Sequence, residues 1–250
     1  MATKKAQEVK GEERLENVES ALSKTELWIE EHQKLIYGII AAVIVIAGII
    51  WGLKALNDKK NAAASREIFT AQQYFEKEMW DAALVGDGNY LGFTEVYDSY
   101  SSTKAGKLAA YYAGICNMKL GKYEEAIDYL KKFNGKDDIL APMALGAIGD
   151  CYMELDDMNN AAAYYEKAAN KSTNEFTGPM FLTKAAMTHE MLGNYAAALK
   201  CYKTLKADYP LSNEGLEVSR NIANMEEKLK YCGSSISAPQ SSLLHSWKPS

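Results

Sequence analysis

Residues 108–133 read LAAYYAGICNMKLGKYEEAIDYLKKF, and two later stretches of the chain repeat their pattern. Residues 143–168 read MALGAIGDCYMELDDMNNAAAYYEKA, and residues 180–205 read MFLTKAAMTHEMLGNYAAALKCYKTL. Gly114 corresponds to Gly149 and then to Ala186, which gives periods of 35 and 37 residues. Periods of this length indicate an array of similar helical units, each packed on its neighbours.

Three kinds of position recur in these stretches. A small residue stands in the first half, a second small residue stands in the second half, and a large residue follows the latter by four positions. They are, in turn, Gly114, Gly149 and Ala186; Ala126, Ala161 and Ala198; and Leu130, Tyr165 and Tyr202. Small residues let two helices approach closely, and the large residue fills the remaining space. Gly121 and Gly193 lie between the halves, where the first helix must end.

This pattern resembles the tetratricopeptide repeat, a helix–turn–helix unit of about 34 residues. We therefore predict an all-α chain whose main part is an α-solenoid, with three repeats over residues 108–212 and a helix stop at Pro210. A closing helix is expected over 213–230. Residues 231–250 are rich in Ser and aperiodic, and we predict that they are disordered.

A linker helix and a degenerate first repeat are predicted over residues 54–107. Residues 62–80 show helical spacing, and GDGN at residues 86–89 is a turn signal. Beyond the turn, aromatic residues echo the second-helix positions of the later repeats, namely Tyr90, Phe93, Tyr97 and Tyr100.

Residues 35–53 read LIYGIIAAVIVIAGIIWGL and contain no charged side chain. A helix of this length covers roughly the ~30 Å hydrocarbon core of a bilayer. Tyr37 and Trp51 lie near its ends, as interfacial aromatic residues do, and no signal-peptidase-like site follows it. We predict one uncleaved transmembrane helix here. The alternative is a buried core helix, although soluble helices of this length normally show a polar face.

The membrane orientation is not decided by charge. The tail of residues 1–34, predicted to be partly helical, brings only Lys24 and Lys34 close to the span. Basic residues on the other side are Lys54, Lys59, Lys60 and Arg66. The positive-inside rule therefore does not fix which end faces the cytoplasm.

The remaining composition mainly excludes function classes. The formal net charge of −5 argues against nucleic acid as the main partner, and no P-loop, nucleophile elbow or HExxH motif is present. We therefore predict no enzyme activity, no cofactor and no metal site. Cys116 and Cys151 occupy equivalent repeat positions ~8–10 Å apart, too far for a disulfide, and we expect buried thiols there. His189 stands at a repeat position that Tyr usually fills, so we expect it to pack.

In the family that the repeats resemble, the first helices line a concave face that binds protein segments. Mapping its inner-face positions onto this chain gives Leu108, Tyr111, Ile115, Met118, Met143, Gly146, Asp150, Met153, Met180, Thr183, Met187 and Glu190. The methionines among them suit a surface that accepts varied apolar partners. Filling of gaps in the core is the alternative for these methionines, because a register error of one residue exchanges groove and core.

One subclass of these repeats grips a C-terminal carboxylate with Lys, Asn and Arg side chains. The corresponding positions here carry Tyr111, Ile115, Asp150 and Met180, and Lys184 stands alone. We therefore do not expect a carboxylate clamp.

The order of tail, span, linker helix and repeats resembles the ancillary subunit family of the bacterial SecYEG translocon, whose repeat domain is related to that of a cell-division coordinator. The carrying stretches are ESALSKTELWIEEHQK, GDGNYLGF and LAPMALGAIGDCYMEL, and the last two look like the family as it occurs in Bacteroidota-type bacteria. The resemblance covers residues 15–230.

The resemblance implies a single-pass protein of the bacterial inner membrane, held in the lipid by residues 35–53, with its repeats in the periplasm. Its implied partners are Sec translocon subunits, a periplasmic chaperone and segments of exported proteins. The alternative is a scaffold for an envelope complex, in cell division or outer-membrane assembly. Both functions use the same fold, so the fold does not choose between them.

Overall fold

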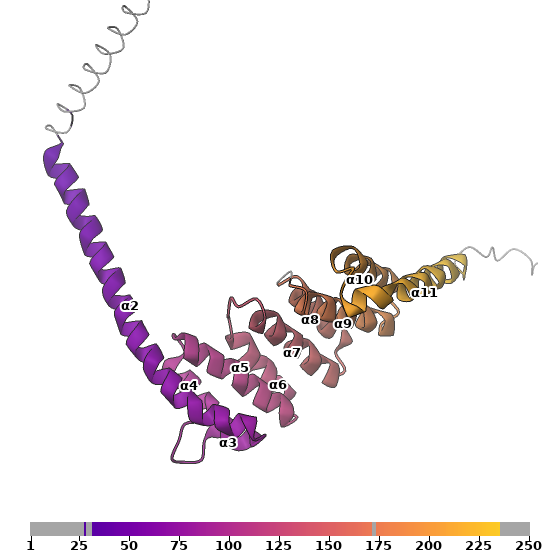
Figure 1. The fold of residues 1–250 in the computed structure, drawn as a ribbon, viewed down its shortest axis with the longest axis horizontal. Coiled ribbons are helices and arrows are strands. Elements are labelled where there is room, and N and C mark those ends of the chain that lie inside the picture. Colours follow the sequence, from indigo (N-terminus) through magenta and orange to yellow (C-terminus); the bar gives the residue numbers. More distant parts are fainter. Residues whose placement is uncertain (1–27, 29–31, 172–173, 236–250) are drawn as a thin grey trace, which may run out of the picture. The chain divides into compact units, whose positions relative to one another are not determined.

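The structure is a computed structural model that describes Trp28, residues 32–171 and residues 174–235 (Figure 1). Within these residues the regular elements are α-helices, and one isolated antiparallel bridge joins Gly86 to Leu91. The predicted all-α fold is therefore confirmed. The chain divides into two compact units, Met1–Asp58 and Lys59–Ser250. Most of the predicted tail helix, and residues 236–250 of the predicted disordered segment, lie outside the described residues.

The first unit contains the N-terminal part of α2, a helix that spans Gln33–Glu76 and includes the whole apolar segment 35–53. Its most apolar window has a mean hydropathy of 2.5 and no buried portion. Residues 37–51 are exposed at every position, and Trp51 is 75% exposed. Apolar side chains thus face outward around the whole helix. This helix is long and apolar enough to cross a membrane.

The second unit begins in the last part of α2, where Ala64, Ile68 and Ala71 are buried on one helix face. Ile68 and Ala71 share an apolar cluster with Phe93 of α4, Phe93–Tyr100. The helix predicted over residues 62–80 ends earlier, at Glu76, because Glu78 adopts a left-handed backbone (φ 58°). A short helix, α3 (Trp80–Val85), follows this break.

The loop between α3 and α4 is held by Asp87. One oxygen of its carboxylate accepts hydrogen bonds from the N–H groups of Asn89 and Tyr90 at 2.9 Å, and the Tyr74 hydroxyl donates to the other at 2.7 Å. The bond from Tyr74, followed by the backbone bonds, lowers the pKa of Asp87. Tyr90 was predicted at a second-helix position, and that prediction is wrong. It lies in this loop, because the turn at Asp87 delays the start of α4 to Phe93.

Three helix pairs follow along the chain and lie side by side (Figure 1). Their bounds are α5 Lys104–Lys119 and α6 Tyr123–Lys132; α7 Leu140–Glu154 and α8 Met158–Ala169; and α9 Thr177–Met191 and α10 Tyr195–Asp208. Among these helices, the backbone of α7 comes close to those of both α5 and α9, whereas the backbone of α8 comes close to neither α6 nor α10. The first helices are therefore closer together than the second helices, which places the first helices on the inner side of the curve.

The two helices of a pair meet at a glycine in the first two pairs. A Cβ atom on Gly149 would lie 2.6 Å from Cε1 of Tyr165, and one on Gly114 would lie 2.5 Å from Cγ of Leu130. Neither position has room for a side chain, because the large residue already fills the space. The small-to-large pairing predicted from the repeats is thus confirmed at these two sites. Ala186 and Tyr202 are both buried in the third pair.

Each first helix ends in the same kind of turn. Gly121, Asp156 and Gly193 have φ values of +73°, +59° and +71°, in the left-handed region. The next residue in each turn donates its N–H to a carbonyl five positions back, at 2.8–2.9 Å. This bond closes the C-terminus of the helix, and glycine adopts the required backbone without a steric cost. Asp156 adopts it with a side chain present, which costs conformational energy.

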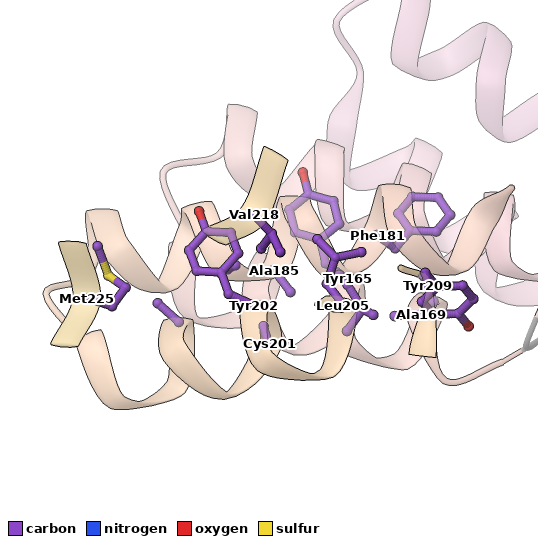
Figure 2. Packing of buried hydrophobic residues seen from close by; sticks show 14 of the residues in the cluster. Tyr165, Ala169, Phe181, Ala185, Cys201, Tyr202, Leu205, Tyr209, Val218 and Met225 are labelled. Carbon is purple, nitrogen blue, oxygen red and sulfur yellow. The ribbon is translucent and has the colours of Figure 1, made fainter. Parts of the chain in front are cut away.

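A final helix, α11 (Asn213–Ser235), covers the end of the array. Val218 and Met225 of α11 are buried in the same cluster as Tyr165, Phe181 and Tyr202 (Figure 2). Burial of this surface removes from water an apolar face that the last pair would otherwise expose. The helix continues past Lys230, where the sequence pattern placed its end.

The N-termini of the second helices differ in their capping. Asp157 accepts a hydrogen bond from the N–H of Asn160 at 3.1 Å, and Asn194 accepts one from Ala197 at 3.4 Å. Lys122 occupies the equivalent position before α6, and its side chain makes no capping bond. An ammonium group has no acceptor atom, and its positive charge opposes the helix dipole.

We expect Lys122→Asn to increase the free energy of unfolding by about 1 kcal/mol relative to Lys122→Ala. Both substitutions remove the charge, and only asparagine supplies a cap, so alanine is the matched control. Chemical denaturation of the full chain in mild detergent, followed by circular dichroism, measures the difference. Equal stability of the two variants would contradict a missing cap at this helix.

Candidate protein-binding groove

The predicted groove residues all lie on first helices. They are Leu108, Tyr111, Ile115 and Met118 on α5; Met143, Asp150 and Met153 on α7; and Met180, Thr183, Met187 and Glu190 on α9. Each of them is at least partly exposed, and Met187 is 55% exposed. Gly146 is the exception among the mapped positions, because it is buried against the ring of Phe181. The other residues form a row that runs across the neighbouring first helices α5, α7 and α9.

Most apolar members of this row also contact the core. Met143, Met153 and Met180 pack against the cluster of buried residues from α8 to α11, and Met118 packs against a cluster that includes Ile127 and Ile148. These side chains are half-buried, so part of each is in the core and part is on the surface. Two roles were considered for these methionines, lining the groove and filling gaps in the core. One residue can therefore serve both roles.

Asp150, in the middle of the row, is held by partners on two other helices. Its Oδ1 atom accepts a hydrogen bond from the Tyr165 hydroxyl of α8 at 2.6 Å, and it lies 2.6 Å from Nζ of Lys184 on α9. The Lys184 ammonium also lies 5.4 Å from the centre of the Tyr165 ring. Burial, then the hydrogen bond to Asp150, raises the pKa of Tyr165. This tyrosine thus remains a neutral donor to the carboxylate.

Glu190 has a similar arrangement one pair further along. The hydroxyl of Tyr202 on α10 donates to Oε1 of Glu190 at 2.6 Å, and Nζ of Lys228 on α11 lies 3.5 Å from Oε2. Burial, then Glu190, raises the pKa of Tyr202. Both groove carboxylates are therefore paired with a tyrosine and a lysine of this chain. Such short bonds to a carboxylate are stronger than neutral ones, while half-exposed ion pairs contribute ~0–1 kcal/mol.

These two networks change the charge that the predicted groove presents to a partner. Lys184 looked like a lone cation, and the structure shows it ion-paired to Asp150. Sequence reasoning missed both networks, although Tyr165 and Tyr202 stand at equivalent repeat positions. The signal that could have revealed them is that each of these tyrosines lies on the second helix of a pair whose first helix carries an acid, Asp150 or Glu190. The groove accordingly offers mainly apolar contact, and each of these two acids is already ion-paired with a lysine.

Buried cysteines do not add chemistry to this face. Cys116, Cys151 and Cys201 are free and buried, as predicted for the first two. Burial raises the pKa of the Cys116 and Cys151 thiols to about 12 and that of Cys201 to about 11. All three are therefore protonated at neutral pH and are poor nucleophiles.

The helix pairs match a known repeat family. Sequence profiles described as tetratricopeptide repeat match residues 108–136, 144–175 and 182–212. The chain therefore contains tetratricopeptide repeats. Such repeats are generally non-enzymatic modules that bind proteins or peptides. A comparison with curated proteins finds no match.

Two solved structures are similar to this chain. The MamA protein is 15% identical over 73% of this chain and 98% of its own, with a TM-score of 0.43. A Podospora anserina protein, described as a kinesin light chain with nearly identical tetratricopeptide-like repeats, is 9% identical. That alignment covers 70% of this chain and 91% of the other, with a TM-score of 0.47.

Neighbouring residues of α9 allow the exposed and buried faces of a tetratricopeptide helix to be compared. We expect Met187→Glu to change the free energy of unfolding by less than about 0.5 kcal/mol, because this side chain already faces water. Ala186→Glu, the matched variant, places a charge at a fully buried position and should cost several kcal/mol. Thermal unfolding of the full chain in mild detergent compares them. A large loss for Met187→Glu would place that residue in the core.

Proposed function

We propose that this chain is a membrane-anchored, non-enzymatic subunit that holds protein segments on the inner face of its tetratricopeptide repeats. The observation that carries this proposal is the row of half-exposed apolar side chains along α5, α7 and α9. The anchor is the apolar part of α2, which is long enough to cross a bilayer. A protein segment bound on the inner face of the repeats would be tethered, through this anchor, to the membrane.

The chemistry of this face favours an apolar segment. Methionine side chains are flexible and polarizable, so they adapt to guests of different shape. Asp150 and Glu190 are already paired within the chain, and neither presents a free charge that a guest must match. A weakly selective apolar surface is suited to polypeptides that have not yet folded, since these still expose their hydrophobic residues.

We further propose that the membrane is the bacterial inner membrane, that the repeats lie in the periplasm, and that the partners are Sec translocon subunits and a periplasmic chaperone. The resemblance of residues 15–230 to the ancillary translocon subunits supports this assignment. In that role the repeats would receive exported proteins as they emerge. An envelope scaffold for cell division or outer-membrane assembly would use the same anchor and face with other partners.

Site-specific photo-crosslinking tests which face of the repeats is used. A photoreactive amino acid is placed at Met187 on α9 and, as the matched control, at Ala163, which is exposed on the second helix α8. The full chain is crosslinked in its native membrane, and the adducts are identified by mass spectrometry. We expect adducts with translocon subunits and exported proteins at Met187, at least tenfold more abundant than at Ala163.

Other results would separate the alternatives. Adducts at Met187 with division or peptidoglycan-synthesis proteins, without Sec subunits, would favour the scaffold. Equal labelling from Met187 and Ala163 would contradict a binding site on the inner face. Release of the repeats by a variant that lacks residues 35–53 would test the anchor separately.

A further inference from the structure

We propose that Glu166, His189 and Cys201 form a site for a zinc-class divalent metal ion between the second and third repeats. The three side chains come from consecutive helices, α8, α9 and α10, of which α8 and α10 each pack against α9. One donor atom from each residue lies within 4.8 Å of the donor atoms of the other two. The set combines a carboxylate oxygen, an imidazole nitrogen and a thiol sulfur.

These donors need only small movements to surround an ion. Zinc binds nitrogen and oxygen ligands at about 2.0–2.2 Å and sulfur at about 2.3 Å, which places tetrahedral ligands roughly 3.5 Å apart. His189 Nε2 and Glu166 Oε1 are now 2.6 Å apart, as a hydrogen bond requires. An ion would separate them by about 1 Å, within reach of a glutamate rotamer change. The backbones of the three helices can stay in place.

Burial of the three residues suits a bound ion with one route of entry. The His189 side chain is 12% exposed and Cys201 is buried, whereas the Glu166 side chain is 45% exposed. Figure 2 shows Cys201 among buried residues of α8, α9, α10 and α11. An ion would therefore enter past Glu166 and meet the histidine and cysteine behind it. Water reaching the same opening can supply the fourth ligand.

His189 carries an unsatisfied atom that supports this assignment. Its Nδ1 atom is buried and has no hydrogen-bond partner, while Nε2 is paired with Glu166. A buried polar atom without a partner costs about 1–3 kcal/mol. A metal-ligating imidazole binds the ion through one ring nitrogen and hydrogen-bonds through the other. Within the described residues His189 has a partner for only one of its two ring nitrogens, so it retains the capacity for the ligand that this arrangement requires.

The repeat itself provides an internal comparison. With the offsets of 35 and 37 residues, the equivalent positions between the first and second repeats are Lys131, Tyr152 and Tyr164. There the centroids of the two tyrosine rings lie 5.4 Å apart in a tilted arrangement, and the Lys131 ammonium lies 6.0 Å from the centroid of the Tyr152 ring. Between the first and second repeats these positions are thus filled by ordinary side-chain packing. Between the second and third repeats, residues with potential metal-binding atoms stand at all three positions. A change of all three residues to metal-binding types points to a ligand.

The donor set selects the class of ion. Imidazole with thiolate suits zinc and its spectroscopic substitute cobalt, and it disfavours magnesium and calcium, which prefer oxygen ligands. Binding replaces the proton of the Cys201 thiol with the metal, and that proton leaves to solvent. No oxidant or reductant is needed. The ion would tie α8, α9 and α10 together and stiffen the junction between the repeats.

Titration of the full chain with cobalt(II) in mild detergent tests the proposal. We expect one equivalent to bind, with a near-ultraviolet thiolate-to-cobalt charge-transfer band that zinc then abolishes. Cys201→Ser should remove the band, and Glu166→Gln should weaken binding at least tenfold. Glu166 is the most exposed of the three, so this second variant remains folded even where a change at Cys201 disturbs packing.

Cys116→Ser and Cys232→Ser are the matched controls, because each removes a thiol outside the three-residue set. Both should keep the band and the affinity of the unmodified chain. Absence of a band in the unmodified chain, or a band that survives Cys201→Ser, would overturn the proposal. Equal cobalt affinity for Glu166→Gln and the unmodified chain would do the same. None of these results depends on which protein partner occupies the groove.

Discussion

The close approach of two helices within each repeat is the constraint on which the array depends. Gly114 and Gly149 have no space for a side chain, since Leu130 and Tyr165 occupy it. Once these helices are in contact, the short turn between them fixes their relative direction, and each pair presents one first helix to the inner side. The position of the candidate groove therefore follows from a packing contact on the opposite side of those same helices.

The part of the fold that is local in sequence could be predicted from it. Helix pairs, left-handed turns at Gly121 and Gly193, and the long apolar helix all leave a signal within a few residues or at a fixed period. Inner-face residues could be assigned to the first helices for the same reason. Their degree of burial could not be predicted, because it depends on how far each pair rotates against the next.

The sequence did not reveal the contacts between helix pairs whose residues are separated along the chain by a number that differs from the repeat period. Asp150 and Lys184 are 34 residues apart in the chain, and Glu190 and Lys228 are 38 apart. An alignment of equivalent positions therefore places neither lysine beside its acid. The break at Glu78 and the delayed start of α4 depend on a loop held by Asp87 and Tyr74, which no periodicity describes.

The contacts between neighbouring pairs also have a mechanical consequence. The backbones of the first helices come close to one another along the inner side, whereas on the outer side the backbone of α8 comes close to neither α6 nor α10. The inner row therefore resists sliding more than the outer row does. Such an array is stiff along one edge and compliant along the other, so that it responds to load by changing its curvature while each helix pair keeps its own core.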